Sequence, residues 1–418
     1  MGKQKGAIWV LIITSLLFLI TIAIPVHANN DPQKGFDDYI RKAMTEWQVP
    51  GLAVVVVKGD ETVLMKGYGT RVVSEDLEID EKTYVQIASN SKTFTAFLFG
   101  MLVDDGLLRW DDPIKKYIPE LELADPYVTE HVAIDDLLCH RSGLSAEAPG
   151  GFQNRNYTIK NLLQDIKGMK LALRFRSGNI YSQFGMALLG EVVFRATKNS
   201  WEESMKQRIF NPLEMGSSYT SNLDFENRVG KPETVANIMH PAIKKNGVVT
   251  KGDWAKVGTE PLYAPAGGII SNMEDIAKWM SFRLNDGVFK GVRLISLDAI
   301  DEIRKPRLRM AGERINCPNS FLHPRAHLID VGYGQWSFEH RGRKVIVHNG
   351  GWMSSVVAIL PDENIGIGIF SNAYFYEYTP YDSLAFVNAV VLNAIDHYLG
   401  YDYVDWPNEM LKIVKKSK

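Results

Sequence analysis

A serine and a lysine three residues apart, Ser89 and Lys92, are the residues of this chain whose types and spacing most directly suggest chemistry. Three residues is close to one helical turn, so the hydroxyl and the amine can meet on one helix face. Serine is a poor nucleophile until a neighbour accepts its proton, and a lysine accepts one only where burial or another cation disfavours its charged form. The next residues recur at helical spacing and predict a deeply buried helix: Phe94, Phe97, Leu98, Met101 and Leu102. At the start of that helix, free N–H groups would favour negative charge on a bound carbonyl oxygen.

The Ser89 and Lys92 pair also has a plainer interpretation. About one or two chance matches to Ser-x-x-Lys are expected in a chain of this length at ordinary residue frequencies. The serine would then cap a helix, and the lysine would be solvated in its first turn. Further motifs must decide between a nucleophile and a helix cap.

A second motif, Tyr181-Ser182-Gln183, stands between a turn-rich segment and a helical pattern. A cationic Lys92 would stabilise a phenolate at Tyr181, which could take the Ser89 proton and return it to the leaving group. Gln183 could orient the Lys92 ammonium or a substrate amide. The alternative is a half-buried tyrosine that packs against the neighbouring helix.

A third motif, His348-Asn349-Gly350-Gly351, follows an apolar strand. Glycines at a strand end allow a substrate backbone to approach closely, and the N–H groups of Gly351 and Ser89 could form an oxyanion hole. His348 would add a polar or cationic group. A histidine beside a glycine turn can also be purely structural.

The composition bounds the class of protein. The 418 residues are 45% hydrophobic, enough for a large core, and the formal net charge of −2 gives no sign of nucleic-acid binding. Residues 1–28 carry lysines, a long apolar run and a small-residue end at Ala28, which predicts a signal peptide or an uncleaved membrane anchor. We therefore expect a secreted or extracytoplasmic domain over residues 29–400, followed by a C-terminal tail over 401–418 whose lysines are solvated.

The two cysteines, Cys139 and Cys317, permit at most one intrachain bridge, and we expect two free buried thiols. Cys317 precedes His323 and His327, which are four residues apart, but Pro318 and Pro324 oppose the helix that such metal-ligand spacing requires. No metal or other cofactor is predicted. The absence of a Gly-x-Ser-x-Gly elbow argues against an α/β-hydrolase.

The two chain ends predict the strands of one antiparallel sheet. Continuous or alternating apolar runs give strands over Leu52–Val57, Thr62–Gly69, Lys344–His348, Ser354–Leu360 and Ile365–Ser371. Helical patterns cover Phe36–Trp47, Lys92–Asp104, Asp135–Cys139, Gln183–Thr197, Trp201–Ile209, Met273–Asn285 and Tyr381–Tyr398. The expected fold is α+β: an antiparallel sheet built from both chain ends, flanked by helices, with a mainly helical region inserted between them.

In order and separation, the three motifs resemble the active-site elements of the class C β-lactamase and D-alanyl-D-alanine carboxypeptidase family of penicillin-recognising serine hydrolases. The segments 137–144 and 263–268 also look like this family, and the resemblance covers about residues 36–400. It implies that Ser89 is acylated, that Lys92 and Tyr181 transfer its proton, and that Gly350 and Gly351 belong with His348 to a third element on the sheet edge. The family needs no metal.

Two departures bear on function. Gln183 stands where the family usually has asparagine, and His348 stands where dedicated class C β-lactamases have lysine. The resemblance therefore favours a penicillin-binding D,D-carboxypeptidase or a D-aminopeptidase that acts on D-amino-acid-containing peptides of the cell wall. The alternatives are an esterase or weak β-lactamase and, from another class, a non-catalytic penicillin-sensing or wall-binding protein. Small peptides, esters and β-lactams are the expected ligands, and the sequence leaves the oligomeric state and the choice between Lys92 and Tyr181 as base open.

Overall fold

The computed structural model describes residues 32–254, 259–311, 328–375 and 382–416. The segment 1–28 and the residues Cys317, His323 and His327 lie outside this part of the chain. None of the described helices combines the length and the apolarity needed to cross a bilayer.

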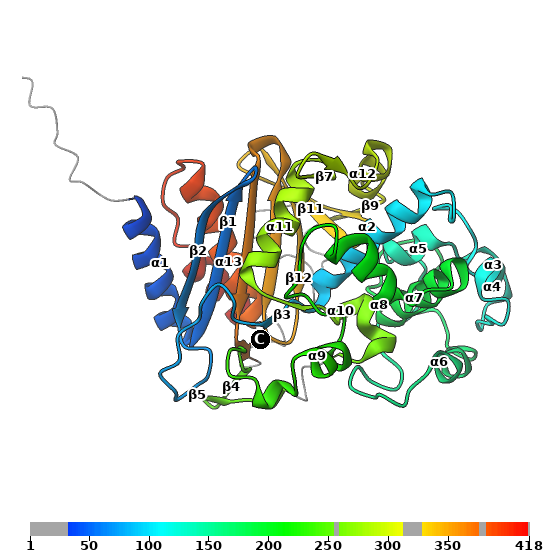
Figure 1. Cartoon of the computed structure of the whole chain (residues 1–418), viewed down its shortest axis with the longest axis horizontal. Coiled ribbons are helices and arrows are strands. Elements are labelled where there is room, and N and C mark those ends of the chain that lie inside the picture. Colours follow the sequence, from blue (N-terminus) through cyan, green and yellow to red (C-terminus); the bar gives the residue numbers. More distant parts are fainter. Residues whose placement is uncertain (1–31, 255–258, 312–327, 376–381, 417–418) are drawn as a thin grey trace, which may run out of the picture.

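An eight-stranded sheet has the order β2-β1-β14-β13-β12-β11-β10-β9 (Figure 1). Every neighbouring pair of strands in it is antiparallel. The N-terminal strands join the C-terminal ones where β1 pairs with β14, with Leu52 opposite Ser371. The α+β fold and the sheet built from both chain ends are therefore confirmed. The strands are β1 (Gly51–Lys58), β2 (Glu61–Gly69), β9 (Leu308–Ala311), β10 (Leu328–Gly332), β11 (Gln335–His340), β12 (Arg343–Gly350), β13 (Ser355–Leu360) and β14 (Ile365–Ser371).

Helices cover both faces of this sheet (Figure 1). One face contacts α11 (Met273–Leu284), which packs on β1 and β14, and the other contacts α13 (Asp382–Tyr398). Gly366 of β14 allows the close approach of α11, because a Cβ there would lie 3.0 Å from the Cβ of Met280. Helix α1 (Pro32–Trp47) lies beside α13.

The inserted region is mainly helical, as expected. Its helices are α2 (Ser91–Asp104), α3 (Ile114–Tyr117), α4 (Pro126–His131), α5 (Ile134–Leu138), α6 (Ile159–Ile166), α7 (Gln183–Thr197), α8 (Trp201–Met205), α9 (Asn222–Arg228), α10 (Ala264–Gly267) and α12 (Leu297–Arg304). Small sheets pair β3 (Val85–Gln86) with β6 (Ile270–Ser271), β7 (Val288–Phe289) with β8 (Val292–Arg293), and β4 (Ala242–Lys245) with both β5 (Val248–Lys251) and β15 (Ala373–Phe375).

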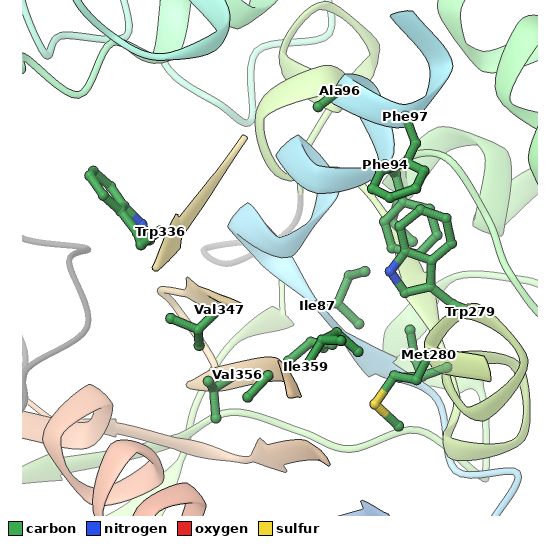
Figure 2. Packing of buried hydrophobic residues seen from close by; sticks show 14 of the residues in the cluster. Ile87, Phe94, Ala96, Phe97, Trp279, Met280, Trp336, Val347, Val356 and Ile359 are labelled. Carbon is green, nitrogen blue, oxygen red and sulfur yellow. The ribbon is translucent and has the colours of Figure 1, made fainter. Parts of the chain in front are cut away.

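Helix α2 is the buried element that joins the sheet to the helical region. Phe94 stacks on Trp279 of α11 with ring centroids 3.9 Å apart, and Phe97 meets the same indole edge-on (Figure 2). Aromatic pairs in such geometries add to the stability gained from burial. They hold α2, and with it the turn that carries Ser89, against the body of the protein.

Two sequence predictions need correction. The helix expected over Trp201–Ile209 is α8 followed by a π-helical turn, Lys206–Phe210. The expected tail over 401–418 instead contains helix α14 (Trp406–Lys416). Trp406 is buried and its indole N–H donates to Asp396 of α13 at 2.8 Å, so a tertiary contact fixes this segment.

Candidate active site

Ser89 lies in a 3₁₀ turn, Ala88–Asn90, that leads directly into α2. Ala88 has φ +45°, a left-handed backbone that L-residues rarely adopt. The hydroxyl of Ser91 stabilises this turn, because it donates to the Ala88 carbonyl at 2.7 Å and accepts the Ile269 N–H at 3.1 Å. Ser89 itself is 8% exposed, which leaves its hydroxyl at a boundary between protein and solvent.

Lys92 is fully buried directly beneath Ser89. Its Nζ lies 3.1 Å from Ser89 Oγ, 2.9 Å from Gln183 Oε1 and 2.6 Å from the Ala266 carbonyl oxygen. These three acceptors match the three N–H donors of an ammonium group. The structure thus brings the nucleophile and the lysine of the first motif into hydrogen-bond contact and adds Gln183 of the second.

Tyr181 is buried beside this lysine, immediately before α7. The Lys92 Nζ lies 4.6 Å from the centroid of the phenol ring, within the range of a cation–π interaction. The rings of His140 and Trp336 flank the phenol at centroid distances of 4.5 and 6.2 Å. This packing fixes the orientation of Tyr181 next to Lys92.

His348 lies near the end of β12 and contributes a neutral imidazole. Burial, reinforced by the positive charge of Lys92, lowers the pKa of His348 to about 3. Its Nδ1 is 2.6 Å from the Asn349 carbonyl oxygen, which can only accept, so Nδ1 carries the hydrogen. The cationic role considered for His348 is therefore wrong at neutral pH, and its polar role remains.

Gly350 and Gly351 bring the sheet edge to the nucleophile. A Cβ at Gly350 would lie 2.4 Å from the Ile87 carbonyl oxygen and 3.0 Å from Ala88 Cβ, so only glycine fits against the Ser89 turn. Gly351 and Ser89 both line one cavity of about 210 Å³. A shared cavity is one condition that an oxyanion hole from their N–H groups must meet.

His140 is a site residue that the sequence motifs did not assign. Its ring lies against Tyr181, and its Nδ1 accepts the Ser182 N–H at 3.3 Å. Burial and the charge of Lys92 hold the pKa of His140 well below its usual value, so this ring is neutral too. The His140 carbonyl accepts the Ile180 N–H at 2.9 Å, which ties the approach to Tyr181 onto this segment. The segment 137–144 looked familiar in the sequence, but only the fold shows this contact.

No cluster of metal-ligating side chains occurs within the described ranges. The thiol of Cys139 is free and buried, and burial raises its pKa to about 12, so it is a packing residue. The proposed ligands Cys317, His323 and His327 fall in the segment that is not described.

These features are typical of the active site of a serine hydrolase: a serine hydroxyl in contact with a buried lysine, an adjacent tyrosine, a strand end with glycines, and a cavity. A family model described as Beta-lactamase matches residues 36–385, and the chain belongs to this family. This confirms the resemblance to penicillin-recognising serine hydrolases that the three motifs indicated.

Solved structures of the same fold support the assignment. An octameric penicillin-binding protein homologue from Pyrococcus abyssi has a TM-score of 0.69 and 23% identity, over 88% of this chain and 77% of that one. A beta-lactamase/D-alanine carboxypeptidase from Yersinia pestis has a TM-score of 0.66 and 20% identity, over 87% of this chain and 98% of that one. At these identities the likeness concerns the fold.

Curated relatives are distant. Protein flp of Staphylococcus aureus strain MW2 is 23% identical over 359 residues, which are 84% of this chain and 65% of that protein. The unguisins hydrolase ungD' of Aspergillus campestris is 22% identical over 408 residues, 93% of this chain and 71% of that protein. The chain thus spans about two thirds of the length of Protein flp.

Proposed function

We propose that this protein hydrolyses a peptide or ester bond through an acyl-enzyme on Ser89, with D-amino-acid-containing peptides as the first substrate class. The observation that carries this proposal is the 3.1 Å contact between Lys92 Nζ and Ser89 Oγ at the edge of a cavity. A helix-capping serine with a solvated lysine, the plainer interpretation, does not fit a lysine that is fully buried.

In the acylation step, Ser89 Oγ attacks the substrate carbonyl carbon and its proton passes to the Lys92 and Tyr181 pair. The negative charge that develops on the carbonyl oxygen is stabilised by the N–H groups of Ser89 and Gly351. Collapse of the tetrahedral intermediate breaks the bond to the leaving group, which takes the proton from the pair. The product is an ester between Ser89 and the acyl group.

Water completes the cycle by the reverse route. It attacks the ester carbonyl while the Lys92 and Tyr181 pair accepts its proton, and the same N–H groups stabilise the second oxyanion. Breakage of the ester bond returns the proton to Ser89 Oγ and releases the acid. The three acceptors around Lys92 Nζ support its ammonium form, and in that state Tyr181 is the member of the pair that accepts and returns the proton.

Two considerations support peptides with D-amino acids. The chain belongs to the Beta-lactamase family, and one solved structure of the same fold is described as a D-alanine carboxypeptidase. The pattern of residues 1–28 supports a location outside the cytoplasm, where cell-wall peptides occur.

An ester is the second candidate substrate. The observation that favours it is the neutral His348 in the third element, because a neutral imidazole offers no ion pair to a terminal carboxylate such as that of a D-Ala-D-Ala peptide or of a β-lactam. Weak β-lactamase activity is disfavoured for the same reason.

The test combines labelling and turnover. Intact-protein mass spectrometry would follow a reporter penicillin on the wild type, on Ser89→Ala and on Ser74→Ala, which alters an exposed serine and serves as the control. Rates on a D-Ala-D-Ala peptide, a p-nitrophenyl ester and a chromogenic cephalosporin would be measured in parallel. We expect turnover of at least one substrate by the wild type and the control and none by Ser89→Ala.

Other outcomes would redirect the proposal. Labelling or turnover that persists in Ser89→Ala would show that Ser89 is not the nucleophile. A stable adduct without turnover of any substrate would support a penicillin-sensing protein instead.

A further inference from the structure

The cavity beside Ser89 has an aromatic wall made of Phe152, Trp352 and Tyr374. The Trp352 ring lies 5.8 Å from the Phe152 ring, edge-on, and 5.8 Å from the Tyr374 ring. All three side chains are half-buried. They therefore support one another and also line the space in which an acyl group attached to Ser89 would lie.

Trp352 is held in an unusual backbone conformation. Its φ of +64° lies in the left-handed region, which glycine adopts freely and which is rare for a bulky residue. Such a conformation costs on the order of 1–3 kcal/mol and persists where the surrounding structure requires it, often at ligand sites. Trp352 directly follows Gly351, so this strain places an indole one residue from the N–H expected to bind the oxyanion.

The same cavity offers polar groups without charge. Among the described residues that line it, none carries a charged side chain. The hydroxyl of Thr259 is buried there and has no hydrogen-bond partner within the described part of the chain. That hydroxyl could bond a neutral carbonyl or amide. A carboxylate in this space would lose its hydration without gaining a cation from the described lining.

We propose that the acyl pocket of this enzyme selects uncharged aromatic acyl groups and that Trp352 is the residue that sets this preference. The proposal rests on the proposed function, since it concerns the acyl group transferred to Ser89. It narrows the substrate to esters or blocked peptides whose acyl side carries an aryl group, and it excludes acyl donors with a free carboxylate.

Two ratios of kcat/KM test the proposal. The first compares p-nitrophenyl phenylacetate with p-nitrophenyl acetate in the wild type, Trp352→Ala and Trp352→Phe. Burial of an aromatic ring contributes on the order of tenfold or more in binding. We expect the phenylacetate-to-acetate ratio to fall about tenfold in Trp352→Ala and to stay within about threefold in Trp352→Phe, which keeps an aromatic face.

The second ratio needs no variant, so it remains informative if Trp352→Ala does not fold. It compares mono-p-nitrophenyl glutarate with its methyl ester in the wild type, and we expect the neutral methyl ester to be the better substrate by about tenfold or more. An equal or inverted ratio would overturn the proposal, as would an unchanged phenylacetate-to-acetate ratio in a folded Trp352→Ala.

The experiments distinguish failure of the proposed function from failure of the proposed acyl selection. If no ester is hydrolysed in a way that needs Ser89, the proposed function fails. If hydrolysis needs Ser89 but either ratio fails to behave as expected, the acyl-enzyme mechanism stands and the proposed acyl selection does not.

Discussion

The neutral state of His348 predicts a specific loss of stability in acid. Its pKa is lowered from 6.5 to about 3 in the folded protein, so between these values the unfolded chain binds a proton that the folded protein does not. Stability is therefore fully present above about pH 6.5 and is lost as the pH falls towards 3. Two-state linkage over these pKa values gives a loss of roughly 2–3 kcal/mol between about pH 7 and about pH 4.5.

The variant His348→Gln isolates this contribution, because glutamine keeps a donor for the Asn349 carbonyl and never gains a proton. Urea unfolding at about pH 7 and about pH 4.5 would give the free energy of unfolding of both proteins. We expect the wild type to lose roughly 2–3 kcal/mol more than the variant over this interval. The carboxylates titrate in both proteins, so their effects cancel in the comparison. Burial and Lys92, the two largest causes, lower the pKa of His140 in both proteins, and only the smaller influence of His348 on it differs.

An equal loss in the two proteins would refute the reasoning. It would mean that His348 titrates near its usual pKa and is not held neutral by burial and by Lys92. A cationic imidazole at the third motif would then be available near neutral pH, and the argument that favours esters over peptides with a terminal carboxylate would lose its support.

Three substitutions test the geometry of the site. Lys92→Ala should lower kcat about a hundredfold or more, measured on a p-nitrophenyl ester, because it removes a proton-transfer partner; a normal rate would exclude Lys92 from the mechanism. Gln183→Asn has a side chain one methylene shorter and should weaken the 2.9 Å hydrogen bond from the Lys92 ammonium, a bond to a charged group that is worth about 1.5–3 kcal/mol. We expect kcat/KM to fall about tenfold or more. An unchanged kcat/KM would show that this contact is dispensable. Gly350→Ala should destabilise the fold by about 1–3 kcal/mol in urea unfolding, because its Cβ would lie 2.4 Å from the Ile87 carbonyl oxygen. The control Gly168→Ala meets nothing within 4 Å, and equal stability of the two variants would contradict this packing.

The strands of the central sheet could be predicted because their sequences are continuous apolar runs. The boundaries expected for Ile365–Ser371 agree with β14, and β1 and β2 each differ from the expected strands by one residue at one or both ends. The short strand β9 gave no such signal, because Leu308–Ala311 is four residues long and includes Arg309, and its hydrogen bonds come from pairing with β10. Strand length and burial thus decide which parts of the sheet the sequence reveals.

The sequence could predict only those parts of the site that are formed by side chains in recognisable motifs. Ser89 and Lys92 are close in sequence, and spacing alone places them on one face. The third acceptor of Lys92 is the backbone carbonyl of Ala266, which no residue type indicates. The left-handed backbone of Trp352 is likewise invisible in a sequence, because tertiary contacts impose it against the preference of the residue.

The segment 401–418 shows how local composition can mislead. Its lysines suggested a solvated tail, but Lys412, Lys415 and Lys416 lie in the second half of helix α14. The indole of Trp406 determines its place, through a hydrogen bond to the buried Asp396, which also accepts from Arg341 and lies 2.7 Å from His340 Nε2. This contact depends on the positions of three other elements, so it could not be predicted from the sequence of the segment alone.

The sheet that joins both chain ends has a consequence for how the protein reaches its folded state. The N–H of Gly51 donates a hydrogen bond to the side chain of Asn372 across 321 residues of sequence, and β1 pairs with β14 from Leu52 to Lys58. Contacts so distant in sequence close late and slowly, because a long loop must be ordered before they form. During synthesis, β1 would stay unpaired with β14 until almost the entire chain has emerged. Its run of valines would stay exposed for that time, so the protein should depend on assistance from chaperones to avoid aggregation before the nucleophile and the strand end that faces it come together.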